Sequence, residues 1–213
     1  VVTEVLVARH DPELENPSKP IGSNLEGHFA KKYAEREGWT IQEEPGHGWR
    51  RVVASPRPVE ILEIDAIRDL ANAGYVVVAC GGGGIPVRRN VEGILTGVEA
   101  VIDKDYVSGL LAQEVGADLL IILTAVEKVA VGFGTKDERS ISKLSVSAAQ
   151  KHLSDGEFPK GSMGPKVEAI IEFLKHGGSA GLITNPDSLT AAMGGTTGTW
   201  INVNGGIPNF TVG

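Results

Sequence analysis

Residues 105–123 read DYVSGLLAQEVGADLLIIL, and this stretch decides the fold. Its first half has apolar residues at helical spacing, namely Val107, Leu110, Leu111 and Val115. Gly116 follows where a helix of that length would end. Residues 119–123 are then five consecutive apolar residues, a run typical of a strand that is buried on both faces, as in parallel sheets. A helix followed directly by such a strand predicts an α/β fold.

The same alternation of helix and strand extends outward in both directions along the chain. Helical spacing of apolar residues recurs over residues 64–71, 147–153 and 167–174, and short apolar runs recur at 75–79, 180–184 and 199–203. Asn185 and Pro186 provide a cap and a first-turn proline for one further short helix. We therefore predict a doubly wound, mainly parallel sheet in a three-layer α/β/α arrangement, forming one domain over residues 1–213.

Residues 16–54 interrupt this alternation and predict a small protruding flap subdomain. Residues 39–43 and 49–54 have the pattern of two strands around a turn at 45–48. Ser23 and Glu26 match a capping box, which predicts a helix that begins there and ends at Gly38.

Composition and charge limit the classes of function. The 213 residues contain 20 Lys and Arg against 27 Asp and Glu, a net charge of −7, which argues against a broad nucleic-acid-binding surface. No apolar run approaches the roughly 20 residues of a membrane span. Cys80 is the single cysteine, and the five histidines show no metal-binding spacing, so no metal ligands are predicted. The sequence starts without a basic, apolar leader, and we expect a cytoplasmic protein.

Three turns could bind an anion where predicted strands end or helices begin. The first contains four consecutive glycines, 81–84, whose amide groups a bulky anion could approach. The second is the Asp-Lys-Asp sequence at 103–105, and the third is GSMGPK at 161–166. Each has a simpler interpretation: a turn chosen for its dihedral angles, a capped helix start with a solvated charge pair, and a loop with a surface lysine. Their shared placement favours one anion-binding face.

Six segments resemble carbamate kinase, a member of the amino acid kinase superfamily, and they occur in the same order from Val1 to about Val203. They are NPSKPIG at 16–22, GWRRVV at 48–53, GGGGIP at 81–86, VEAVIDKD at 98–105, ILTAVEKV at 122–129 and GSMGPKVE at 161–168. The resemblance implies reversible phosphoryl transfer between ATP and carbamate, giving ADP and carbamoyl phosphate, with Mg²⁺. It also implies an amino acid kinase fold, a homodimer, a cytoplasmic location and a place in arginine metabolism.

Site residues follow from the same resemblance. Lys104 and Lys166 match the lysines at the transferring phosphate, Asp105 matches the aspartate that orients them, and Lys19 matches the flap lysine. The substrate-binding positions are Gly81, Gly82, Gly83 and Lys19. The nucleotide-binding positions are Thr124, Ala125, Val126, Val131, Gly132, Phe133, Met163, Gly164 and Lys166.

The sequence departs from the family pattern at three places. Family members carry, ahead of the position that matches Val1, a strand ending in a Gly-Gly-Asn turn that holds carbamoyl phosphate, and this sequence has no such segment. We therefore expect part of that substrate site and of the sheet to be missing. The SNLE sequence at 23–26 replaces an aromatic-containing stretch, and Gly132 replaces an asparagine. Two alternatives remain open: another amino acid kinase with a different acceptor, and a non-catalytic nucleotide-binding protein or fragment of this fold.

Overall fold

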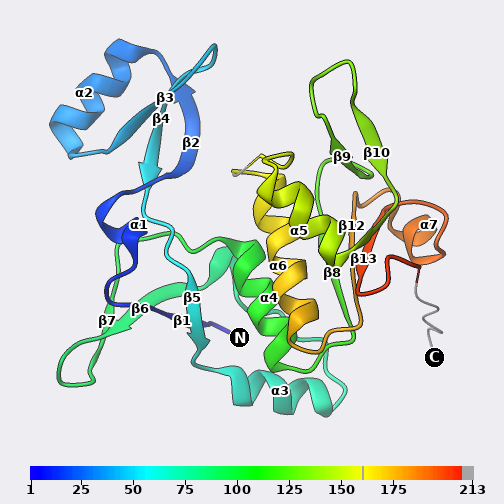
Figure 1. Cartoon of the computed structure of the whole chain (residues 1–213). Coiled ribbons are helices and arrows are strands. Elements are labelled where there is room, and N and C mark those ends of the chain that lie inside the picture. The colour runs from blue at the N-terminus through cyan, green and yellow to red at the C-terminus, as the bar shows by residue number, and fades with distance from the viewer. Residues whose placement is uncertain (160, 208–213) are drawn as a thin grey trace. The chain divides into compact units, whose positions relative to one another are not determined.

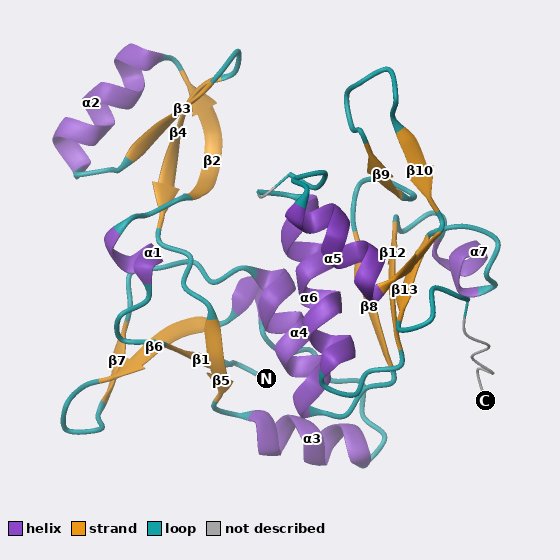
Figure 2. Cartoon of the chain, viewed as in Figure 1, coloured by secondary structure: helices purple, strands orange, loops and turns teal. Residues whose placement is uncertain are grey.

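The computed structural model describes residues 1–159 and 161–207, which include both helices and strands (Figure 2). The chain divides into two compact units. The first unit comprises residues 1–63 and 78–104, and the second comprises residues 64–77 and 105–213. Each unit has its own strands and its own buried residues, and they are described in turn.

The first unit contains a four-stranded sheet in the order β5-β1-β6-β7. Its strands are β1 (Glu4–Val7), β5 (Pro58–Ile61), β6 (Ile85–Arg89) and β7 (Leu95–Gly97). β1 pairs in parallel with β6, and the other two pairs are antiparallel. Val5, Ile61 and Val87 are buried along it. A short helix, α1 (Pro12–Glu15), follows β1 and is capped by the carboxylate of Asp11.

The first unit also contains the predicted flap as an antiparallel sheet in the order β2-β4-β3. Its strands are β2 (Lys19–Leu25), β3 (Ile41–Glu44) and β4 (Gly48–Val53), and helix α2 (Gly27–Glu37) lies beside them (Figure 1). The two predicted strands and the end of the helix at Gly38 are confirmed. The capping box is wrong, because Ser23 belongs to β2 and α2 starts at Gly27. Pairing of Leu25 with Trp49 keeps this segment in the sheet rather than in a helix cap.

The second unit contains a four-stranded sheet in the order β11-β13-β12-β8. Its strands are β8 (Leu119–Leu123), β11 (Lys143–Ser145), β12 (Ala180–Thr184) and β13 (Thr199–Asn202). Around them are α3 (Ile64–Asn72), α4 (Lys104–Glu114), α5 (Val146–Ser154), α6 (Met163–Lys175), α7 (Leu189–Met193) and a hairpin of β9 (Val129–Val131) and β10 (Arg139–Ile141). β8 and β12 are parallel, β11 and β13 are parallel, and β12 and β13 are antiparallel.

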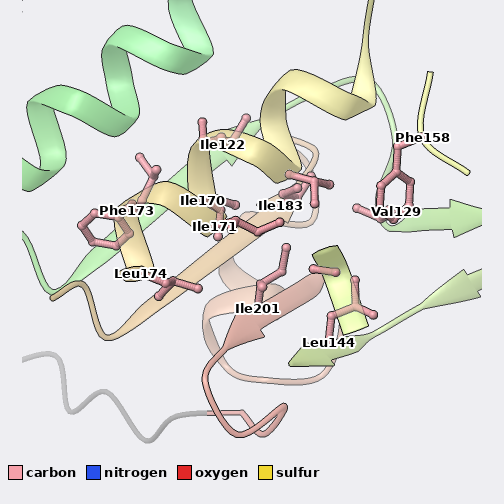
Figure 3. Close-up of a cluster of buried hydrophobic side chains, with 14 of the residues drawn as sticks. Ile122, Val129, Leu144, Phe158, Ile170, Ile171, Phe173, Leu174, Ile183 and Ile201 are labelled. Carbon is pink, nitrogen blue, oxygen red and sulfur yellow. The ribbon is translucent and has the colours of Figure 1, made fainter. Parts of the chain in front are cut away.

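The core of the second unit lies on both faces of this sheet. Alternate residues of the strands point to opposite faces, so Ile183 and Ile201 share one face and belong to a cluster with buried residues of α5 and α6. Figure 3 shows them with Ile170 and Ile171 of α6. Leu182 and Trp200 pack on the other face against α7. Helices therefore cover both faces, and the predicted α/β fold with parallel strand pairs is confirmed. The antiparallel pairing of β12 with β13 makes the sheet mixed.

The predicted strand at residues 75–79 is wrong. The structure assigns no strand there, and the side chains of Val76 and Val78 are 97% and 78% exposed. Within the described ranges 1–159 and 161–207, no strand pairs with this segment. An apolar run becomes a buried strand only if a neighbour satisfies its amide and carbonyl groups and covers its faces, and local sequence does not supply that neighbour.

Close packing in the second unit predicts that position 181 of β12 will not accept a residue larger than glycine. A Cβ atom at Gly181 would lie 2.2 Å from Cγ2 of Ile170, which is fully buried in α6. We expect Gly181→Ala to lower the free energy of unfolding by about 1–3 kcal/mol, because the core must shift to make room. Gly97→Ala is the control, since a Cβ atom there meets nothing within 4 Å. Equal denaturant midpoints for the two variants would contradict this packing argument.

The Cys80 thiol is predicted to be poorly reactive in the folded chain. Burial raises the pKa of this thiol, while a hydrogen bond with Thr3 acts in the opposite direction. The unfolded chain therefore ionises first as the pH rises, and at pH 8.5 the folded chain holds less thiolate. We expect iodoacetamide to alkylate Cys80 at least about tenfold more slowly in the native chain than in denaturant, measured as one mass shift. Equal rates would show that this thiol is accessible and ionised.

Candidate functional site

A buried ion pair joins the beginnings of helices α4 and α6. The Nζ atom of Lys166 donates a hydrogen bond to Oδ2 of Asp105 at 2.6 Å. The two side chains are only 10% and 7% exposed. Such a pair is tolerated in the interior because each charge compensates the other, and loss of one partner leaves an uncompensated buried charge. Asp105 and Lys166, which the sequence resemblance linked by role, are thus in direct contact.

Two further contacts show that α4 and α6 run in the same direction (Figure 1). Tyr106 donates a hydrogen bond from its hydroxyl to Oε2 of Glu168 at 2.8 Å. One turn further along, a Cβ atom on Gly109 would lie 3.1 Å from the carbonyl oxygen of Ala169. Since the contacts advance together along both helices, the two amino termini lie at the same end. The positive dipole ends of both helices therefore lie at the same end, which favours an anion there.

Lys104 is exposed as the first residue of α4, directly before the buried Asp105. On the other side of Lys104, the carboxylate of Asp103 accepts a hydrogen bond from the Nζ atom of Lys19 at 2.6 Å. Each aspartate of the Asp-Lys-Asp sequence therefore holds one lysine from a distant part of the chain, 84 and 61 residues away. This pairing is more specific than the capped helix start with a solvated charge pair that the local sequence also allowed.

The four-glycine run forms a tight turn against the residue that precedes Asp103. Gly83 has a φ of 110°, and a Cβ atom there would lie 2.2 Å from the carbonyl oxygen of Ile102. The amide groups of Gly83 and Gly84 donate to Cys80 and Gly81 within the turn. Gly81 and Gly82 are exposed. Gly83 therefore has a packing role, and Gly81 and Gly82 are the glycines whose backbone an anion can approach.

A cavity of about 540 Å³ lies beyond the carboxyl end of β8. Its lining residues are Thr124, Ala125, Val126, Glu127, Lys128, Ala130, Phe133, Glu138, Ser140, Pro159, Ser162 and Met163. The amide group of Thr124 donates to the carbonyl oxygen of Thr184 at 2.9 Å, which holds the ends of β8 and β12 together below the cavity. This volume is within the range of small-molecule sites, and the carboxyl end of parallel strands is where α/β folds bind ligands.

Five of the predicted nucleotide-binding residues line this cavity, namely Thr124, Ala125, Val126, Phe133 and Met163. The other four lie elsewhere. Val131 is buried in the hydrophobic core, and the amide group of Gly132 donates to Glu157. Gly164 is buried, and a Cβ atom there would lie 3.1 Å from the carbonyl oxygen of Pro159. Lys166 is paired with Asp105.

Sequence reasoning missed the part of the lining that comes from residues 127–128 after β8, from the β9–β10 hairpin and from the segment before α6. These residues are Glu127, Lys128, Ala130, Glu138, Ser140, Pro159 and Ser162. The hairpin pairs Val131 with Arg139 and so brings Glu138 and Ser140 over the cavity. A strand signal on each side of Gly132–Gly134 could have indicated this hairpin, but the short strands of three residues each give a weak pattern.

Within the part of the chain that the structure describes, no group of three or more His, Cys, Asp or Glu side chains is placed to hold a metal ion. No described helix combines the length and the apolar character needed to cross a bilayer.

Known proteins similar to this chain include carbamate kinases. The chain is 45% identical to "Carbamate kinase" of Thermococcus kodakarensis, over 94% of this chain and 64% of that protein. It is 47% identical to "Carbamate kinase 3" of Staphylococcus aureus, over 94% of this chain and 65% of that protein. A solved structure of the Giardia lamblia carbamate kinase bound to AMP-PNP aligns with a TM-score of 0.82 at 39% identity, covering 95% of this chain and 64% of that one.

The chain thus spans a little under two thirds of the length of these curated relatives. The model of the Amino acid kinase family matches residues 23–185. This matched segment contains the four-glycine turn, the Asp-Lys-Asp sequence, the cavity beyond β8 and the buried Asp105–Lys166 pair. With a family match over most of its length and an α/β fold shared with solved carbamate kinases, the chain belongs to the amino acid kinase family.

Proposed function

We propose that this protein is a carbamate kinase, which transfers a phosphoryl group reversibly between ATP and carbamate to give ADP and carbamoyl phosphate. The observation that carries the proposal is the buried Asp105–Lys166 pair at the paired amino termini of α4 and α6, with Lys104 beside Asp105 in the sequence. Sequence identities of 45–47% to curated carbamate kinases support this choice of acceptor.

The proposed chemistry needs positioning and charge neutralisation rather than a general base. In the direction of ATP synthesis, the bond between the phosphorus and the carbamate oxygen breaks, and a bond forms between that phosphorus and a β-phosphate oxygen of ADP. Carbamate leaves as an anion and ADP attacks as one, so no proton must move. The ammonium groups of Lys104 and Lys166 and the amino termini of α4 and α6 would stabilise the negative charge that shifts between the two oxygens.

The cavity beyond β8 would hold the nucleotide. Its volume of about 540 Å³ suits a small-molecule ligand, and Phe133, Val126 and Met163 provide apolar surface for a base. Met163 is also the first residue of α6, so a nucleotide in this cavity would have its phosphates near a helix amino terminus.

Magnesium fits this proposal as a companion of the nucleotide. Mg²⁺ is usually bound through one or two carboxylates together with substrate phosphates, and it neutralises phosphate charge when bound. The described residues do not form a three-ligand metal site, so phosphate oxygens would supply most of the coordination. A homodimer, a cytoplasmic location and a place in arginine metabolism belong to the same proposal and rest on the resemblance to carbamate kinase.

The role of Lys104 is tested in an assay of ATP formation from ADP, Mg²⁺ and carbamoyl phosphate, with a no-enzyme control. We expect Lys104→Ala to lower kcat by about 10²–10³-fold, because one preorganised positive charge at the transferring group is lost. Its melting temperature should stay close to that of the reference chain, because Lys104 is exposed. Lys32→Ala, at an exposed position of α2, is the matched control and should retain full turnover.

Three results, from this assay, from a second phosphoryl donor and from calorimetry, would contradict the proposal or favour another function. Unchanged turnover in Lys104→Ala would contradict the role given to this lysine. ATP formed from acetyl phosphate in preference to carbamoyl phosphate would indicate an amino acid kinase with another acceptor. Binding of ADP by calorimetry without any ATP formation would favour a non-catalytic nucleotide-binding protein.

A further prediction tests whether the cavity beyond β8 holds the nucleotide. Phe133 lines this cavity and is 64% exposed. We expect Phe133→Ala to raise the KM for ADP about threefold to tenfold, because an aromatic contact with the base contributes about 0.5–1.5 kcal/mol. The KM for carbamoyl phosphate should not change. Phe29→Ala, at an exposed aromatic residue of α2, is the control, and equal effects of the two changes would place the nucleotide elsewhere.

A further inference from the structure

The ion pair between Lys19 and Asp103 connects the base of the flap to the residue before Lys104. Lys19 is the first residue of β2, and its backbone pairs with Val53 of β4. Its Nζ atom lies 2.6 Å from Oδ2 of Asp103, and the two side chains are 25% and 13% exposed. The residues are 84 positions apart in the sequence, so this contact is formed only in the folded chain.

The shielding of this pair distinguishes it from the exposed ion pairs among the described residues. In the Lys151–Asp155 pair, at the end of α5, the side chains are 74% and 46% exposed. Exposed pairs of that kind contribute little and leave the lysine free to sample many rotamers. A carboxylate that is 13% exposed instead needs its charge compensated, and the charge-assisted hydrogen bond from Lys19 holds the long lysine side chain in one place.

We propose that Asp103 is a positioning residue that holds the ammonium group of Lys19 for phosphoryl transfer. This inference rests on the proposed function and adds to it that the ammonium group of Lys19, at the position matching the flap lysine, neutralises charge on the substrate. Asp105 holds Lys166 by a hydrogen bond of the same length from the other side of Lys104. The two aspartates of the Asp-Lys-Asp sequence therefore each position one lysine from a distant segment. In this proposal Asp103 positions Lys19 as Asp105 positions Lys166.

The turnover test compares Asp103→Asn, which keeps the shape of the side chain and removes its charge, with the reference chain. We expect kcat divided by the KM for carbamoyl phosphate to fall about tenfold to a hundredfold, because a displaced ammonium group no longer meets the transferring phosphoryl group. The KM for ADP should stay within about twofold. Asp155→Asn, which breaks the exposed Lys151–Asp155 pair, is the matched control and should leave both constants unchanged.

A double-mutant cycle tests whether Asp103 acts through Lys19. In a Lys19→Met background, where there is no ammonium group to hold, Asp103→Asn should change turnover less than about threefold. Asp103→Glu should restore part of the lost turnover, since it returns the charge with one extra methylene group. A merely structural role would instead lower the melting temperature and would give the same loss with and without Lys19.

Acylation of Lys19 supplies a readout that does not depend on turnover. In the reference chain, acetic anhydride should label Lys19 more slowly than the exposed Lys31 and Lys32, as measured by mass spectrometry of peptides. Asp103→Asn should raise the rate at Lys19 at least about fivefold and leave Lys31 and Lys32 unchanged.

Failure of the proposed function and failure of the positioning role of Asp103 give different results. If the reference chain makes ATP and Asp103→Asn makes it equally well, the positioning role is refuted and the proposed function stands. If the reference chain makes no ATP, the proposed function fails, and the acylation rate alone decides whether Asp103 holds Lys19. An unchanged acylation rate at Lys19 in Asp103→Asn would overturn the inference in either case.

Discussion

The buried pair between Asp105 and Lys166 is the interaction on which the candidate site depends. Both side chains are at most 10% exposed, so removal of either would leave a charge without solvent or partner, at a cost of about 3–5 kcal/mol. The pair forms only if α4 and α6 lie parallel with their amino termini together. The close approach of Gly109 to Ala169 permits that arrangement, and the Tyr106–Glu168 hydrogen bond maintains it. The packing of α4 against α6 therefore also determines where the charges of Asp105 and Lys166 lie.

Backbone geometry also places the other parts of the candidate site, namely the four-glycine turn with the segment after Ile102, and the cavity beyond β8. The four-glycine turn must approach the carbonyl oxygen of Ile102, which only a residue without a Cβ atom allows at Gly83. The segment that follows Ile102 then carries Asp103 and Lys104. In the second unit, parallel pairing of β8 with β12 places Thr124 beside Thr184 and opens the cavity beyond the strand ends. The two candidate ligand-binding features, the four-glycine turn and the cavity beyond β8, thus arise from a turn that requires glycine and from the parallel order of two strands.

The errors of sequence reasoning have a common cause. Ser23 and Glu26 match a capping box, yet pairing of Leu25 with Trp49 extends β2 through Ser23. Residues 75–79 have the composition of a buried strand, yet Val76 is 97% exposed because no described strand pairs there. Both patterns are local, and in both cases the outcome was decided by whether a partner strand lay alongside. Segments such as residues 119–123, which do have such a partner in β12, were predicted correctly.

The sequence by itself determined the α/β class, most of the helices, the strands at residues 41–44, 48–53, 119–123, 180–184 and 199–202, and the glycine- and lysine-bearing turns that a phosphate-transferring site would use. Those features depend on periodicity and residue type, which are local properties of the chain. Only the tertiary structure decided that Lys19 pairs with Asp103 and Lys166 with Asp105, that Gly83 serves packing, and that Ser140 lines the cavity while Val131 lies in the core. These contacts bring together residues that are distant in sequence, and they place neighbouring residues in different surroundings. Hydrogen bonds and burial depend on position in space, which the local sequence does not give.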